Sequence, residues 1–115
     1  MSLAEAARAF AMSLPEATED FPWGELVVKV KGKVFVFLGR SEPGQPFGFS
    51  VKLPNSAHDA LALPFAKPTG YGLGRAGWVS LSLPSDDAVE MEQVQAWILE
   101  SYRTVAPKRL AKLTL

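Results

Sequence analysis

The sequence predicts an α+β fold, in which a single two-layer domain over residues 1–115 packs its helices on one face of an antiparallel sheet. Two patterns predict it. Apolar residues recur at helical spacing near both ends of the chain, and they alternate with polar residues in the middle, between Gly- and Pro-rich turns. A chain of 115 residues has the length of one domain with one modest core.

The first helix is expected over residues 3–13. Leu3, Ala7 and Phe10 lie at helical spacing among alanines, which are strong helix formers. Pro15 ends this helix, because the residue before a proline is disfavoured in the helical conformation.

A β-hairpin follows a loop over residues 16–24. Residues 26–31 and 33–40 are rich in Val and Phe, and Gly32 supplies the positive φ that a tight turn requires. With Lys31 and Gly32 as the turn, the expected pairs are Val30 with Lys33, Val28 with Phe35, and Leu26 with Phe37.

The two faces of this hairpin differ in character. The face with the larger side chains is expected in the core, and the opposite face is semi-apolar with one basic residue. That second face, called the open face below, is expected to carry Val27, Lys29, Val34 and Val36.

The second half of the chain repeats these patterns. Ser85, Asp86 and Asp87 are expected to cap the longest helix. The apolar side of this helix includes Tyr102, which is expected to be buried with its hydroxyl bonded to an internal partner. The other expected elements are a strand over 47–52, a short helix over 56–62, a long loop over 64–77, a strand over 79–83, and helix 86–105. The shared core is expected to contain Phe10, Val28, Phe35, Val94 and Ile98.

Five short segments resemble, in order, the YjbR/MmcQ family of small bacterial proteins. They are Phe21-Pro22-Trp23-Gly24-Glu25, Val28-Lys29-Val30, Val51-Lys52-Leu53-Pro54, Gly77-Trp78-Val79 and Ser101-Tyr102. The resemblance extends from about Phe10 to about Lys112. It implies a fold similar to frataxin (CyaY-like), and it implies DNA binding, the activity with which the family is usually labelled.

Charge is balanced overall but segregated along the chain. The formal net charge is zero, which argues against a strongly electrostatic nucleic-acid binder. Residues 85–100 hold five acids and no base, whereas residues 101–115 hold four bases and no acid. Acids at helix starts and bases at helix ends also complement the helix dipole, so this distribution has a structural explanation as well.

The candidate nucleic-acid site combines an aromatic residue with bases. Trp78 is expected on the open face, where its ring can stack on an unpaired base while the cations contact phosphates. The alternative is that Trp78 packs under the 64–77 loop and that the bases are ordinary solvated residues. The candidate residues are Lys29, Lys52, Arg75, Trp78, Lys108 and Arg109.

Composition argues against catalysis and against bound cofactors. The chain has no cysteine and one histidine, His58, so thiolate chemistry and multi-histidine metal sites are not expected. Residues 72–77 match G-x-G-x-x-G, but a strand rather than a helix is expected after them, so no dinucleotide site follows. We expect no enzyme activity, cofactor, metal or membrane span, and a cytoplasmic location.

Two function hypotheses follow from the sequence. One is a non-specific nucleic-acid-binding module, with DNA as partner, that uses the open face and the basic C-terminus. The alternative is a protein-interaction or small-ligand-binding module on the same semi-apolar face, with neither nucleic acid nor catalysis. Bases clustered on one surface favour the first, and an apolar face with scattered bases favours the second.

Overall fold

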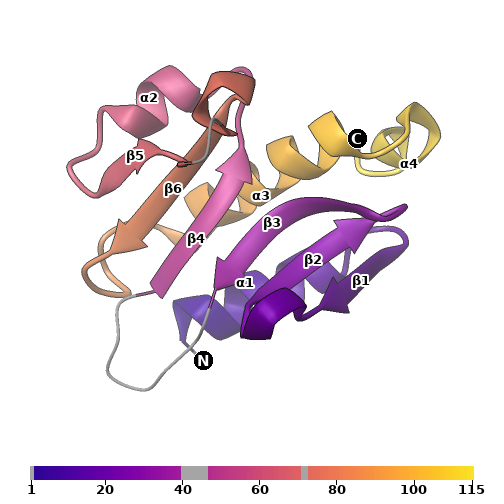
Figure 1. Cartoon of the computed structure of the whole chain (residues 1–115), viewed down its shortest axis with the longest axis horizontal. Helices are drawn as coiled ribbons and strands as arrows, with labels where there is room; N and C mark the ends of the chain where they lie inside the picture. The colour runs from indigo at the N-terminus through magenta and orange to yellow at the C-terminus, as the bar shows by residue number, and fades with distance from the viewer. Residues whose placement is uncertain (1, 40–46, 71–72) are drawn as a thin grey trace.

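A six-stranded antiparallel sheet, in the order β1-β2-β3-β4-β6-β5, organises the computed structural model (Figure 1). The structure describes residues 2–39, 47–70 and 73–115. The strands are β1 Ala17–Asp20, β2 Leu26–Val30, β3 Lys33–Gly39, β4 Phe47–Lys52, β5 Ala66–Pro68 and β6 Trp78–Leu83.

The two longest helices lie behind this sheet in Figure 1 and contact each other and the central strands. They are α1, Leu3–Met12, and α3, Met91–Val105. Short elements complete the fold: α2 Ala57–Leu61, α4 Lys108–Lys112, and the 3-10 turns η1 Pro22–Gly24 and η2 Leu73–Ala76. The expected α+β class is confirmed. Within the described residues, no helix is long and apolar enough to cross a membrane.

Helix starts depend on which residue supplies the cap. The Ser2 hydroxyl accepts a hydrogen bond from the Glu5 N–H, which starts α1 where the sequence predicts it. The start predicted for α3 at residue 86 is wrong. The Ser85 hydroxyl accepts from the Asp87 N–H at 3.3 Å, and this bond closes a local turn, so that α3 begins only at Met91.

Two strands lie inside segments predicted as loops. β1 falls within residues 16–24, and β5 falls within residues 64–77. Both are edge strands of three or four residues, too short to display a periodic pattern. Their neighbours β2 and β6 decide that they pair.

The turn between β2 and β3 is as expected. Lys31 and Gly32 both have positive φ, 52° and 79°, the conformation of a type I′ hairpin turn. The pair Val30–Lys33 is confirmed.

Beyond that pair, the predicted register is wrong because β3 contains a bulge. Lys29 pairs with Val34 and Val28 pairs with Val36, which leaves Phe35 as an extra residue. Phe35 and Val36 are both fully buried in the core on the helix side of the sheet. The alternation therefore shifts by one position, and Phe37 lies on the open face where Val36 was expected.

A hydroxyl from α3 bridges the strands beside this bulge. Ser101 is completely buried, and its hydroxyl donates to the Phe35 carbonyl and accepts from the Lys52 N–H at 2.8 Å. It thereby connects β3 to β4 just beyond their last pair, Val36–Val51. The next residue, Tyr102, packs edge-on against the Phe35 ring at 5.2 Å between ring centroids.

The core matches the sequence expectation. Val28, Phe35, Val94 and Ile98 are fully buried in one cluster, and Phe10 packs against it partly buried. The Tyr102 hydroxyl donates to the Pro15 carbonyl at 2.8 Å, the internal partner expected for it. This bond ties the C-terminal part of α3 to the loop that precedes β1.

We predict that Ser101→Ala lowers the free energy of unfolding by about 1–3 kcal/mol, because it leaves the Phe35 carbonyl and the Lys52 N–H buried without their shared partner. Urea denaturation measures the change. The control is Ser82→Ala, an exposed serine on β6, for which we expect a change within about 0.5 kcal/mol. Equal effects of the two substitutions would contradict the bridging role.

Candidate functional site

The open face carries two of the predicted lysines. Lys52 lies directly opposite Trp78 in the β4–β6 pairing, so the two share a face. Lys29 alternates with buried Val28 along β2 and lies on the same side of the sheet. Its ammonium group is 2.9 Å from the Asp20 carboxylate, so a neighbouring acid already pairs this cation.

Trp78 lies on the open face, as predicted, but its ring is packed. Only 8% of the residue is exposed, and its indole meets the Phe37 ring edge-on at 5.2 Å. Phe37 reaches this position because of the β3 bulge. With Val27, which is also buried outside the main core, the two rings form a small apolar cluster on this face.

Three hydroxyls form a chain beside that cluster. Ser80 lies 2.8 Å from Ser50 and 2.9 Å from Thr69, oxygen to oxygen. Each hydroxyl carries one hydrogen, so three hydroxyls supply three donors for two internal bonds. Among the described residues these oxygens have no further side-chain partner, so the chain keeps one donor for another molecule.

A cleft of about 390 Å³ opens over these groups. It holds a mostly apolar surface with a few polar groups, the usual character of a small-molecule site. Its lining includes Pro22, Glu25, Val27, Phe37, Ser50, Thr69 and Leu73.

The other predicted bases lie at separate places. Arg75 is exposed on η2, which packs on β5 and β6 at one edge of the sheet. Lys108 and Arg109 are exposed on α4, and the Arg109 guanidinium is 3.4 Å from Glu16, which precedes β1 at the opposite edge. The six predicted residues therefore do not form one continuous patch.

A different basic cluster forms around Glu16. Its carboxylate is 2.7 Å from the Lys31 ammonium and 3.4 Å from Arg109, so it holds the hairpin turn and α4 together. Figure 1 shows these two segments at the same end of the molecule. We call this end the basic end; its cations are Lys31, Lys33, Arg103, Lys108, Arg109 and Lys112.

The charges at this end affect the acid between them. The hydrogen bond from Lys31 lowers the pKa of Glu16 below its usual value, and the charges of Lys31 and Arg109 lower it further. Folding lowers the pKa of Glu16. Its carboxylate therefore contributes to stability above its unfolded-state pKa, and this contribution is lost as the pH falls through its folded-state pKa.

Tyr102 shifts in the opposite direction, because burial raises the pKa of its phenol.

Sequence reasoning missed the hydroxyl chain and Phe37. Alternation marks Ser50 and Ser80 as polar residues of their strands, but nothing local to either strand shows that they pair. Thr69 directly follows β5, a strand that the sequence analysis did not predict, so its position beside Ser80 could not be predicted either. In the described part of the chain, no three side chains of His, Asp or Glu come together as metal ligands.

Comparison with known proteins agrees with the sequence motifs. A family model described as YjbR matches residues 12–104, which is most of the chain. The chain belongs to the YjbR family. No curated protein matches it. The match to YjbR ends within α3, so the hairpin turn of the basic end lies inside the matched range and α4 lies outside it.

We predict that Lys31→Ala raises the pKa of Glu16 towards its usual value, and that Arg109→Ala raises it less, because Lys31 supplies the hydrogen bond. Carboxyl NMR titration measures both values. Asp20 is the internal control: its pKa is lowered by Lys29 and should stay low in both variants. An unchanged Glu16 in Lys31→Ala would contradict the arrangement of the basic end.

Proposed function

We propose that this YjbR protein binds nucleic acid weakly and without sequence preference through its basic end. The observation that carries the proposal is the contact of one carboxylate, Glu16, with both Lys31 and Arg109. It brings together two basic segments that are far apart in sequence. DNA is the proposed partner, the location is cytoplasmic, and no catalysis is involved.

The chemistry of this end suits phosphates. Lys33, Lys108 and Lys112 are exposed and make no ion pair among the described residues. Ammonium and guanidinium groups release counterions from a phosphate backbone when they bind it, and this supplies most of the affinity of non-specific complexes. Because the whole chain is neutral, we expect dissociation constants on the order of micromolar or weaker at physiological salt.

The open face supports nucleic-acid binding less well. Stacking on a base requires an accessible ring, and only 8% of Trp78 is exposed. Lys29 would have to leave Asp20 before it could contact a phosphate. Lys52 remains available on that face and Arg75 at the edge of the sheet, so the experiment must compare the two surfaces.

We predict that Lys33→Gln with Lys108→Gln weakens binding to a short labelled DNA duplex, because fewer phosphates are neutralised in the complex. The slope of log affinity against log salt should become shallower by about 0.9 for each phosphate that the variant no longer neutralises. Lys29→Gln with Lys52→Gln changes net charge equally and should have the smaller effect. Fluorescence anisotropy over a salt series measures both variants.

Glu16→Gln provides a gain-of-affinity test. It removes the carboxylate that pairs Lys31 and Arg109, so DNA binding should tighten several-fold at low salt. Glu92→Gln, an exposed acid in the first turn of α3, is the control for net charge. If the wild type shows no salt-dependent binding to any nucleic acid at low ionic strength, the proposal fails.

A second candidate function uses the open-face cleft. Its specific support is the free donor of the Ser50–Ser80–Thr69 chain beside the apolar surface of Val27 and Phe37. Such a cleft suits a small, largely apolar ligand, or an apolar side chain of a protein partner, that carries one hydrogen-bond acceptor.

We predict that small aromatic ketones shift the backbone amide NMR signals of Val27 and Phe37, and that Ser50→Ala with Thr69→Val weakens this binding because it removes the two hydroxyls of the chain that line the cleft. Ser82→Ala, an exposed serine of the sheet outside the chain, is the control. Equal affinity in both variants would rule out the hydroxyl chain as the donor.

A further inference from the structure

One half of the open face, the side of the sheet turned to the viewer in Figure 1, is basic. Strands β4, β5 and β6, together with η2, carry Lys52, Lys67 and Arg75 and no acidic residue. None of these three cations forms an ion pair with a described residue. This half of the face therefore has positive charge that no neighbouring acid in the described structure neutralises.

The strand register places two of these cations around the hydroxyl chain. Lys67 on β5 lies opposite Ser80 on β6, and Ser50 lies opposite Ser80 on the other side. Lys52 is two residues beyond Ser50 on β4 and so shares its face. Opposite residues of an antiparallel pair have Cβ atoms about 5 Å apart, and a lysine ammonium sits on a flexible four-carbon stem. Both ammonium groups can therefore reach an anion bound at the hydroxyls.

The spare hydrogen of the hydroxyl chain is available inside the open-face cleft. Ser50 and Thr69 line this cleft, and Ser80 bonds to both of them. Whenever Ser80 donates to one of these two hydroxyls, that hydroxyl keeps its own hydrogen for a ligand. A hydrogen bond to an ionised acceptor is about twice as strong as one to a neutral acceptor. This donor therefore favours a ligand with an anionic oxygen.

The acid of this cleft lies at its other end. Glu25 lines the cleft and directly precedes β2. Three strand spacings of about 4.8 Å, or about 14 Å in all, separate β2 from β6. This exceeds the Debye length of about 8 Å at physiological salt, so Glu25 has little effect on an anion bound at the hydroxyl chain.

We propose that the open-face cleft binds a small carboxylate with an apolar body. The carboxylate accepts the spare hydrogen of Ser50 or Thr69. The ammonium groups of Lys52 and Lys67 supply the opposite charge, and the apolar body contacts Phe37. The inference rests on the second candidate function, ligand binding in this cleft, and is independent of nucleic-acid binding at the basic end.

A carboxylate suits this cleft better than a phosphate. A phosphate monoester carries a charge of about −1.5 to −2 at neutral pH and three strong acceptor oxygens. The cleft offers one spare hydroxyl hydrogen beside a mostly apolar surface. A singly charged group with two oxygens therefore leaves fewer acceptors unpaired.

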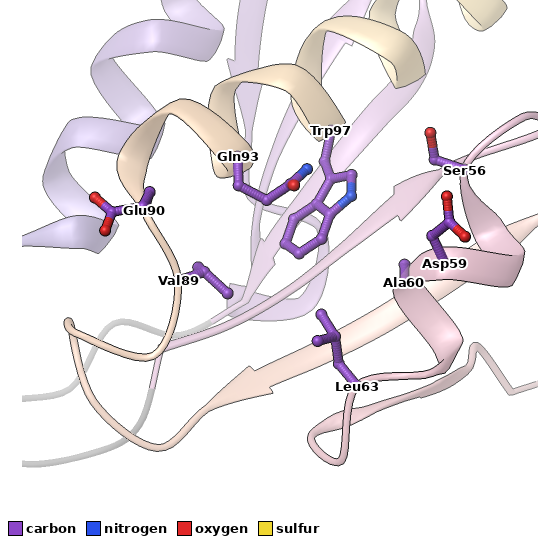
Figure 2. A pocket seen from close by; sticks show the side chains of 8 residues that line it. All are labelled: Ser56, Asp59, Ala60, Leu63, Val89, Glu90, Gln93 and Trp97. Carbon is purple, nitrogen blue, oxygen red and sulfur yellow. The ribbon is translucent and has the colours of Figure 1, made fainter.

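A second cleft, of about 380 Å³, provides an internal control. It lies between α2 and the start of α3 (Figure 2). Its described lining includes Asp59 and Glu90 and no base, and Figure 2 shows the Glu90 carboxylate turned away from the cleft. A carboxylate that requires cations should therefore not enter it, so the amide signals of Leu63 and Val89 should stay unchanged.

NMR titration of the 15N-labelled full chain tests the proposal with two probes of nearly the same shape. 3-Phenylpropanoate and 4-phenylbutan-2-one differ only in a carboxylate oxygen against a methyl group. We expect both to shift the backbone amide signals of Val27 and Phe37, and the carboxylate to bind at least ten-fold more tightly at low salt. Added salt should weaken binding of the carboxylate and leave that of the ketone unchanged.

Lysine variants separate charge from shape. Lys52→Gln and Lys67→Gln should each weaken binding of the carboxylate several-fold and leave binding of the ketone unchanged. Lys29→Gln is the matched control, because Lys29 lies on the same face but is already paired with Asp20, and it should have the smaller effect. An equal loss for both probes in the Lys52 and Lys67 variants would overturn the role of their charge.

The outcomes distinguish this inference from the function on which it rests. Equal affinity for the two probes would overturn the carboxylate proposal and leave ligand binding in the cleft intact. Absence of a saturable shift with either probe would refute both. Tighter binding of 2-phenylethyl phosphate than of 3-phenylpropanoate, or equal shifts at Leu63 and Val89, would also overturn the proposal.

Discussion

One buried hydroxyl of α3 holds the two central strands of the sheet together beside the bulge. Ser101 donates to the Phe35 carbonyl and accepts from the Lys52 N–H, and so connects β3 and β4 where their direct pairing stops. The bulge beside it shifts the alternation of β3 and turns Phe37 to the open face, towards Trp78. The apolar cluster of that face therefore depends on the bulge, whose extra residue, Phe35, accepts the Ser101 hydrogen bond on the helix side of the sheet.

Helix α3 connects the core to the basic end. Its first half carries Trp97, its second half carries Ser101, and its end leads to α4 and the basic end. Acids near its start and bases near its end stabilise the helix through its dipole. The same distribution gives the two ends of a neutral protein opposite charge. The distribution that stabilises the helix thus also separates acidic side chains near its start from the bases of the basic end.

Ion pairs connect segments at the surface of the molecule. Arg8 makes a two-point contact with Glu19 and ties α1 to β1, and Glu16 ties the hairpin turn to α4. Exposed pairs of this kind contribute little stability each, usually below about 1 kcal/mol. Their value here is positional, because they decide which segments lie next to each other at the surface.

Local sequence determined the α+β class, α1, the Lys31-Gly32 turn and the shared core, because helical spacing, turn chemistry and strand alternation act over a few residues. It also supplied the motifs of the YjbR family. Tertiary structure alone decided the bulge at Phe35, the pairing of the edge strands β1 and β5, and the late start of α3. It alone brought Glu16 between Lys31 and Arg109. These features depend on strand register and on partners distant in the chain, and no local pattern records either.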